Sequence, residues 1–227
     1  MQVEGTPLTP KQRFRVGGIT YYYRLGKLQA CTSKRSTSKK GRRRKDEDGN
    51  IIPYRTPKQR KNNIKFTFAR YLFTFLHECF GDLPVWKIAA ARRGMTGENL
   101  MQSINYKYLD DVGQILDLEG IQISLGPLAL PIDLQVTRHG TRVTITWNDS
   151  RDEPSAAQTD RVMVGIFYAE DRETFTLEKE TGATRADGTC EITLQEDDEE
   201  VYIHPFFARV DNTAFSESKG FRLPETE

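Results

Sequence analysis

A dense run of cationic side chains is the feature of this sequence best suited to binding chemistry. Residues 39–45 read KKGRRRK, and further basic residues follow shortly after. Lysine and arginine neutralise phosphates and give salt-dependent, sequence-independent binding to nucleic acid. The same charges would also dock on an acidic protein surface, such as the run at 197–200, or remain a solvated loop. The predicted partner-binding or nucleic-acid-binding set is Lys39, Lys40, Arg42, Arg43, Arg44, Lys45, Arg55, Lys58, Arg60 and Lys61.

Aromatic side chains crowd the segment that follows the basic run. Between residues 64 and 80, apolar residues recur at helical spacing and also fill positions in between. The resulting apolar surface is wider than the single stripe of an ordinary surface helix. It must be covered either by the rest of the chain, as core, or by a partner. The predicted assembly surface comprises Phe66, Phe68, Tyr71, Phe73, Phe75 and Phe80.

Residue types that carry most enzyme chemistry lack the required spacing. His77 and Cys79 are two positions apart on the expected helix and point to different faces, which suits neither a metal site nor a nucleophile pair. Acidic residues form loop-like runs rather than separated pairs in a cleft. The sequence contains no G-x-S-x-G motif, phosphate-binding glycine loop or dinucleotide fingerprint. We therefore predict a protein that is not an enzyme, with no catalytic residue, no metal site and no cofactor.

The net charge of +1 conceals a strong asymmetry along the chain. Residues 1–70 carry 19 basic and 4 acidic residues, whereas residues 71–227 carry 14 basic and 28 acidic residues. Opposite charge on two parts favours mutual docking, head-to-tail contact between copies, or an external polyanion. The three cysteines give no disulfide framework, and we recognise neither a signal peptide nor an apolar run of membrane-spanning length. We expect a cytoplasmic protein, or one incorporated in a virion assembled in the cytoplasm, without membrane contact.

A helix over residues 56–80 would position both the basic and the aromatic residues. Thr56 offers a capping hydroxyl, and Pro57 suits the first turn, where its missing N–H costs nothing. Gly81, followed by Pro84, provides the stop signal. One helix therefore joins a cationic start to an aromatic end.

The chain divides into three predicted parts with different patterns. Residues 1–55 form an extended basic arm with a strand pair and a flexible loop, and residues 56–131 form a helical section with short strands. Residues 132–227 change to a period of two, with six or seven short strands that are typical of a sandwich. The predicted fold class is α+β, ending in a C-terminal antiparallel Ig-like β-sandwich. Its predicted core consists of Leu134, Val136, Val143, Ile145, Trp147, Val162, Val164, Ile166, Phe175, Leu177, Ile192, Leu194, Val201, Ile203, Phe207 and Val210.

Four phrases carry a resemblance to a known family. They read, in chain order, TYYYRLGK, RTPKQRKNNIKFTFARYLF, GMTGENLMQSINYKYL and ATRADGTCEITL. Together they resemble an uncharacterised domain-of-unknown-function family common in Bacteroidetes, with the best match at residues 182–189. The resemblance implies a strand and basic arm, a T-x-x-Q-x-x-R helix and a C-terminal β-sandwich. It implies no activity, and the insertion at 39–48 and the arm before Phe14 depart from the family pattern.

A charged arm joined to a compact β domain is the layout expected of a subunit in a repeated assembly. We therefore favour a non-enzymatic structural or assembly protein whose partners are protein subunits, including further copies of itself. A phage virion component, such as a neck or tail ring subunit, is the most specific expectation and rests on analogy. The alternative is a nucleic-acid-binding accessory protein that uses the basic arm.

Overall fold

The computed structural model describes residues 13–16, 19–24, 27–32, 56–131, 133–148, 155–169, 174–195 and 200–225. Two compact units contain them, Met1–Thr56 and Pro57–Glu227. The first boundary lies one residue from the predicted end of the arm. The predicted boundary after residue 131, by contrast, falls inside the second unit.

The first unit contains a small antiparallel sheet. Its strands are β1 (Arg13–Val16), β2 (Ile19–Arg24) and β3 (Lys27–Thr32), in the order β1-β2-β3. Pairing of Tyr21 with both Phe14 and Ala30 sets the register. The β-rich run that begins at residue 19 thus forms two strands instead of one. The return strand predicted at 51–54 lies outside the described residues.

The second unit begins with three helices. They are α1 (Pro57–Phe80), α2 (Val85–Ala91) and α3 (Gly97–Asn105), and the 3-10 turn η1 (Tyr106–Tyr108) follows directly. The prediction of a long helix ending at residue 80 is confirmed, and Gly81 adopts a left-handed φ of 59° at its end. The Thr96 hydroxyl accepts a hydrogen bond from Asn99 N at 3.2 Å, as expected for the residue that caps α3.

Two antiparallel sheets follow the helices and form the predicted sandwich. One sheet has the order β4-β5-β8, with bounds Gln135–His139, Arg142–Thr146 and Thr189–Thr193. The other has the order β10-β9-β6-β7, with bounds Phe221–Leu223, Val201–Ala208, Arg161–Tyr168 and Phe175–Glu178. A 3-10 turn, η2 (Arg185–Asp187), precedes β8. The α+β class with an antiparallel β-sandwich is therefore confirmed.

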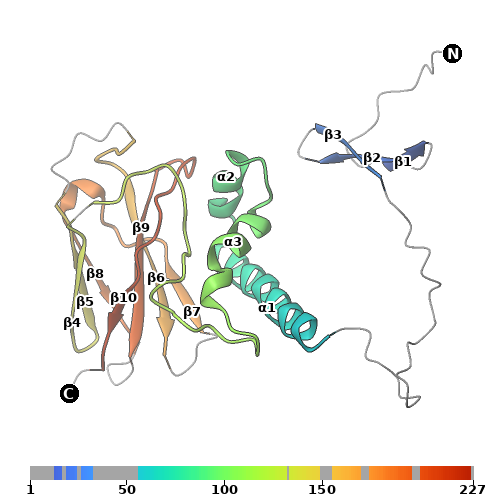
Figure 1. Ribbon diagram of the computed structural model, residues 1–227. Coiled ribbons are helices and arrows are strands. Elements are labelled where there is room, and N and C mark those ends of the chain that lie inside the picture. The colour runs from blue at the N-terminus through green and yellow to red at the C-terminus, as the bar shows by residue number, and fades with distance from the viewer. Residues whose placement is uncertain are drawn as a thin grey trace. The chain divides into compact units, whose positions relative to one another are not determined.

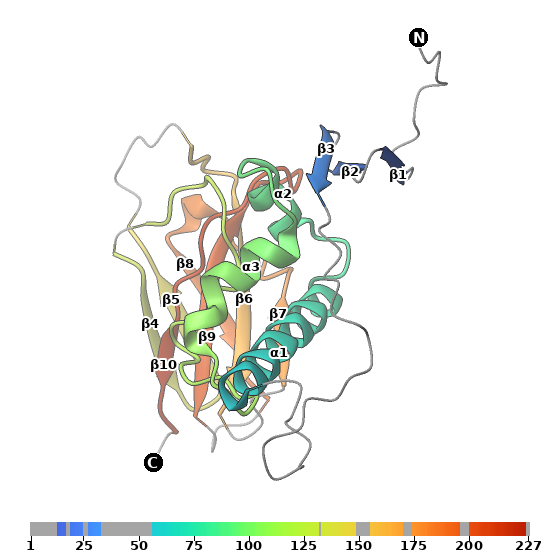
Figure 2. The ribbon, with the colours of Figure 1, turned by 45° about the vertical axis from the view of Figure 1, so that its right-hand side comes forward.

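The central strands β6 and β9 are covered on both faces. On β6, Val162, Val164 and Ile166 belong to a core shared with the β4-β5-β8 sheet, whereas Met163 and Phe167 belong to a core shared with the helices. Strand β9 alternates in the same way. The unit consequently has three layers. The β10-β9-β6-β7 sheet lies in the middle, with the β4-β5-β8 sheet on one face and the helices on the other (Figure 1, Figure 2).

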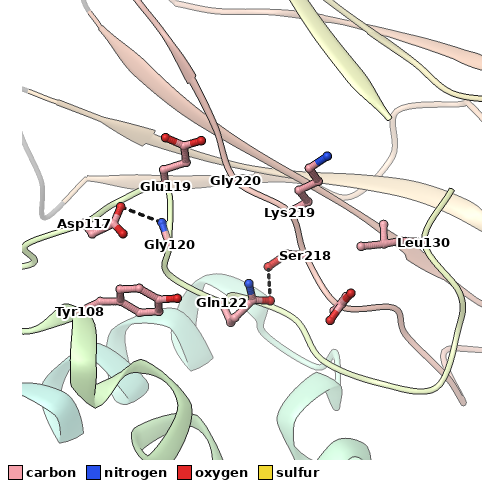
Figure 3. A pocket seen from close by; sticks show the side chains of 10 residues that line it. Tyr108, Asp117, Glu119, Gly120, Gln122, Leu130, Ser218, Lys219 and Gly220 are labelled. Atoms are coloured by element: carbon pink, nitrogen blue, oxygen red, sulfur yellow. Dashed lines mark hydrogen bonds between the residues drawn. The ribbon is translucent and has the colours of Figure 1, made fainter. Parts of the chain in front are cut away.

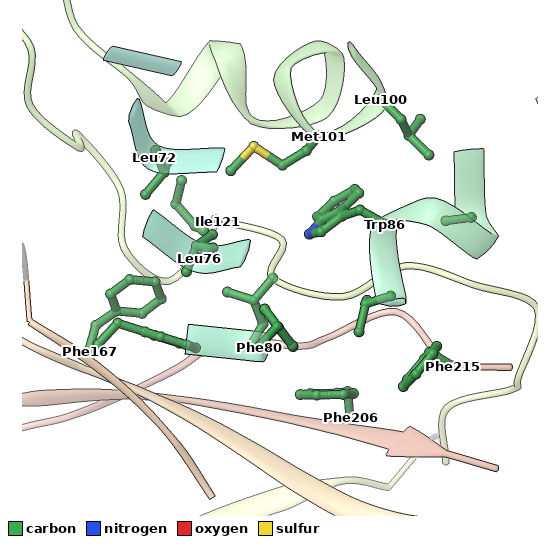
Figure 4. Packing of buried hydrophobic residues seen from close by; sticks show 14 of the residues in the cluster. Leu72, Leu76, Phe80, Trp86, Leu100, Met101, Ile121, Phe167, Phe206 and Phe215 are labelled. Atoms are coloured by element: carbon green, nitrogen blue, oxygen red, sulfur yellow. The ribbon is translucent and has the colours of Figure 1, made fainter. Parts of the chain in front are cut away.

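This layering explains where the predicted core was right and where it was wrong. Thirteen of its members are buried, and Val136 and Leu177 are partly buried. The prediction that Val210 belongs to the core was wrong. Its side chain is 57% exposed, because β9 ends at Ala208 and a turn follows. The period-two pattern missed Phe206 and Phe167, which pack under the helices beside Phe80 (Figure 4).

The connection from the helices to β4 crosses the segment that precedes β10 at close range. Gly126 lies against Phe215, and Gly220 lies against Glu119, so that a Cβ at either glycine would collide with the facing carbonyl oxygen. Hydrogen bonds join the two segments, including Ser124 Oγ to the Ser216 carbonyl at 2.7 Å. The two segments therefore touch through their backbones, which only glycine allows at these positions.

Candidate interaction surface

Helix α1 is anchored to its unit through one face. The Phe80 ring lies 6.1 Å from the Phe206 ring on β9 and 6.2 Å from the Phe175 ring on β7. Lys179 Nζ donates a hydrogen bond to the Phe80 carbonyl at 3.0 Å, which places a cation at the negative end of the helix dipole. The buried residues of α1 are Ala69, Leu72, Leu76 and Phe80.

The six predicted aromatic residues are divided between surface and core. Phe66 and Tyr71 are 50% and 52% exposed. Phe80 is 2% exposed and belongs to the core, so it contributes nothing to an exposed surface. The half-buried residues that pack against the core are Phe68, Phe73 and Phe75. Ile64, which was not in the predicted set, is 47% exposed and extends the apolar surface towards the start of the helix.

A row of aromatic rings connects the exposed surface to the core. The Tyr71 ring stacks on the Phe68 ring at 6.3 Å and on the Phe75 ring at 6.5 Å, because residues three and four apart are neighbours on a helix. The Phe75 ring meets the edge of the Phe175 ring at 6.5 Å. Ring pairs at such separations attract each other. The exposed ring of Tyr71 is therefore held in place before any partner arrives.

The start of α1 is cationic and partly engaged within the unit. Lys61 Nζ lies 2.6 Å from Asp111 Oδ2, and this hydrogen bond raises the pKa of Lys61. Lys65 Nζ lies 4.5 Å from the centroid of the Tyr106 ring, within cation–π range. Lys58 and Arg60 are exposed. The other members of the predicted basic set lie outside the described residues: Lys39, Lys40, Arg42, Arg43, Arg44, Lys45 and Arg55.

The thiols of Cys79 and Cys190 are held in their protonated form. Burial raises the pKa of Cys79, whose Sγ lies 3.8 Å from the Phe175 carbonyl oxygen. Burial also raises the pKa of Cys190 in the sandwich core. A nucleophilic cysteine requires the opposite shift, because the thiolate is the reactive form. Both thiols therefore act as small apolar groups.

His204 is sealed inside the unit on β9. It is fully buried, and its ring and the Phe167 ring form an edge-to-face pair with their centroids 5.4 Å apart. Burial lowers its pKa to about 4, because the charged form is disfavoured away from water. The imidazole is therefore neutral at physiological pH.

An open pocket lies where the two crossing segments meet, which the sequence did not predict. Its volume is about 440 Å³. Figure 3 shows Asp117 and Glu119 on one segment and Ser218 and Lys219 on the other. The residues come together only through the fold, since about a hundred positions separate them. Its carboxylates would attract a cationic group, but no group of three His, Cys, Asp or Glu suited to a metal occurs among the residues described.

The segment with the strongest family resemblance has a structural role. Arg185 and Asp160 are fully buried, with Arg185 Nε 3.5 Å from Asp160 Oδ2. The Arg185 guanidinium also donates to the Ala129 carbonyl at 2.7 Å and lies 4.2 Å from the Phe207 ring centroid. Thr184 and Asp187 form a capping box around η2. The ATRADGT segment therefore links the two sheets to each other and to the connection before β4, which contains Ala129.

A family of unknown function, DUF6266, matches residues 89–219. The chain belongs to this family. The DUF6266 match runs from α2 to the crossing segment before β10, so it includes the middle sheet and the buried Arg185–Asp160 pair. The predicted membership of an uncharacterised family is confirmed.

For this DUF6266 member, the other comparisons gave one negative result and weak likenesses to solved structures. A comparison with curated proteins found no match. A myokine structure is 19% identical, at a TM-score of 0.33, over 44% of this chain and 100% of its own. The chicken CNTN1 FN1-FN3 domains are 8% identical, at a TM-score of 0.34, over 45% of this chain and 32% of theirs. Among the helices that the structure describes, none has the length and apolar character needed to cross a bilayer.

Proposed function

We propose that this chain is a non-enzymatic assembly protein that docks on protein neighbours through the exposed surface of α1. The observation that carries the proposal is the exposure of Ile64, Phe66 and Tyr71, each close to half, on a helix whose other face is fixed in the core. Large apolar side chains on a rigid element are typical of protein interfaces. Protonated Cys79 and Cys190 and the sealed His204 favour structural roles for these residues.

The setting that we propose is a repeated particle, such as a neck or tail ring of a phage assembled in the cytoplasm. In such a particle each copy meets a neighbour through the same surface. The charge asymmetry supports this setting, because residues 1–56 hold 14 basic and 4 acidic residues, whereas the second unit is acidic overall.

The experiment is sedimentation velocity of the purified full chain, from micromolar to near-millimolar concentration. We expect self-association that Phe66→Ser and Tyr71→Ser weaken. Val210→Ser is the matched control, because Val210 is also an exposed apolar residue but lies far from α1 in the sequence, after β9. Equal effects of all three substitutions, or no association at any concentration, would count against the proposal.

Nucleic-acid binding is the second candidate function, and the exposed Lys58 and Arg60 favour it. Phosphate contacts make affinity fall steeply as salt rises. The same purified chain is therefore mixed with single-stranded and double-stranded DNA over a range of salt concentrations. Salt-sensitive binding by a chain that remains monomeric would favour this second function over assembly.

A further inference from the structure

The outer face of α1 carries a regular stripe of exposed residues. Six positions follow one another in steps of four, three, four, three and four residues. Such alternating steps keep side chains in one line along a helix, as in the seam of a coiled coil. The stripe comprises Arg60, Ile64, Thr67, Tyr71, Thr74 and Glu78, all of them exposed. Figure 2 shows α1 running along the outside of the helical layer.

The spacing of this stripe is the same when read from either end. A second α1 laid antiparallel on the first therefore brings the stripe onto itself. Arg60 then faces the Glu78 of the other copy, Ile64 faces its Thr74, and Thr67 faces its Tyr71. Each large side chain meets a small threonine, which lets two helices approach closely while Ile64 and Tyr71 fill the space between them.

The charges of α1 are arranged against its own dipole. Lys58, Arg60 and Lys61 lie in the first turns, where no acidic residue is present, and Glu78 lies in the last turn, with Asp82 just after it. An isolated helix is stabilised by the reverse arrangement. Within the chain, the Lys61–Asp111 ion pair and the Lys179 hydrogen bond to the Phe80 carbonyl already offset part of this arrangement. An antiparallel second copy adds to them, because its acidic end and negative dipole end lie beside the cations. A parallel copy would instead place like charges together.

We infer that α1 pairs with α1 of a second copy of this chain in an antiparallel, two-fold contact along the stripe. The inference rests on the proposed function and names the partner of the stripe, which contains Ile64 and Tyr71 of the α1 surface but not Phe66. A two-fold contact uses the same patch on both copies, so the patch must be self-complementary. The stripe meets this requirement in both spacing and charge.

A charge swap in the full chain tests the pairing. Arg60→Glu and Glu78→Lys are made separately and together, and the dimer dissociation constant is measured by sedimentation equilibrium. Either reversal alone places like charges opposite each other at both ends of the contact, and we expect it to weaken dimerisation at least about tenfold. The double variant restores opposite charges, and we expect its dissociation constant to return to within about threefold of the original.

The rescue can report only a contact between copies. The two positions are 18 residues apart, about 27 Å along one helix at the standard rise per residue, so they cannot touch within a chain. Lys87→Glu and Glu191→Lys are the matched controls, since both residues are exposed and lie on α2 and β8. We expect neither control to change the dissociation constant appreciably. Far-UV circular dichroism of each variant checks that α1 remains folded.

Three outcomes would overturn the pairing. A chain that stays monomeric to near-millimolar concentration does not form the α1–α1 contact. A dimer unaffected by either reversal forms elsewhere. A dimer weakened by the single reversals but not restored by the double variant has a different register or partner surface. If Phe66→Ser and Tyr71→Ser still weaken association in these last two cases, the pairing fails while the proposed function stands.

Discussion

At the scale of single residues, a buried ion pair and a buried histidine shape this protein. Arg185 and Asp160 are both sealed from solvent in the sandwich, and burial of such a pair is tolerable only because each charge has a partner. His204 is different, because it is buried in its neutral form under the helical layer. Because the folded protein keeps His204 neutral, its stability falls in acid.

We predict that His204 makes the free energy of unfolding fall as the pH drops from about 6.5 to about 4. The pKa of the folded state is about 4, below the ordinary value of 6.5, so the unfolded chain binds the proton first. Between pH 7 and pH 4 this linkage lowers the free energy of unfolding by about 3 kcal/mol. Urea unfolding of the original chain and of His204→Leu, compared at the two pH values, measures the effect.

The comparison includes a control at an exposed histidine. His139→Gln, at the end of β4, should keep the pH dependence of the original chain. Identical pH dependence in the original chain and in His204→Leu would show that His204 is not the group responsible.

At the scale of elements, the crossing of the 119–126 and 215–220 segments holds the helices and sandwich together. The segments meet through backbone, and serine side chains complete the contact: Ser124 Oγ donates to the Ser216 carbonyl at 2.7 Å, and Ser218 Oγ accepts from Ile123 N at 3.0 Å. Buried backbone groups are satisfied in this way without a regular strand. The crossing therefore depends on glycine at its closest points.

Gly126→Ala should lower the free energy of unfolding by about 2 kcal/mol or more, because the added methyl group meets the Phe215 carbonyl. Gly94→Ala is the control: no atom lies within 4 Å of its added Cβ, and only its φ of 64° is unfavourable. We expect Gly94→Ala to lower the free energy of unfolding by about 1 kcal/mol. Chemical denaturation gives both values, and a smaller cost at Gly126 than at Gly94 would contradict the close approach.

At the scale of the whole second unit, two cores share one sheet. The alternating residues of β6 and β9 point into opposite cores, so neither core can lose its packing without exposing the middle sheet. The two tryptophans report on them separately, because Trp86 belongs to the helical core and Trp147 to the sandwich core. Unfolding of this unit should therefore be a single transition.

Phe80→Ala tests this cooperativity, because Phe80 lies only in the helical core. Loss of its ring should cost about 3–5 kcal/mol. The substitution is made in Trp86→Phe and Trp147→Phe backgrounds, and tryptophan fluorescence follows urea unfolding in each. We expect the same shift in midpoint from both reporters. A shift seen by Trp86 but not by Trp147 would mean that the helices unfold independently.

Local patterns in the sequence determined the elements of this protein. The signals at Pro57 and Gly81 set the ends of α1, since they act within a single turn. Alternation of apolar residues identified the strands and most of the sandwich core. Local spacing also showed that the apolar surface of α1, which includes Phe66 and Tyr71, is too wide for one buried face.

Tertiary structure alone decided which faces are covered. No local pattern shows that β6 and β9 are buried on both sides, since the covering helices come from residues far away in the sequence. For the same reason Phe80 could not be separated from Phe66 in advance, nor could the pocket at Asp117 be foreseen. Periodicity records which side chains share a face, whereas burial depends on what the folded chain places against that face.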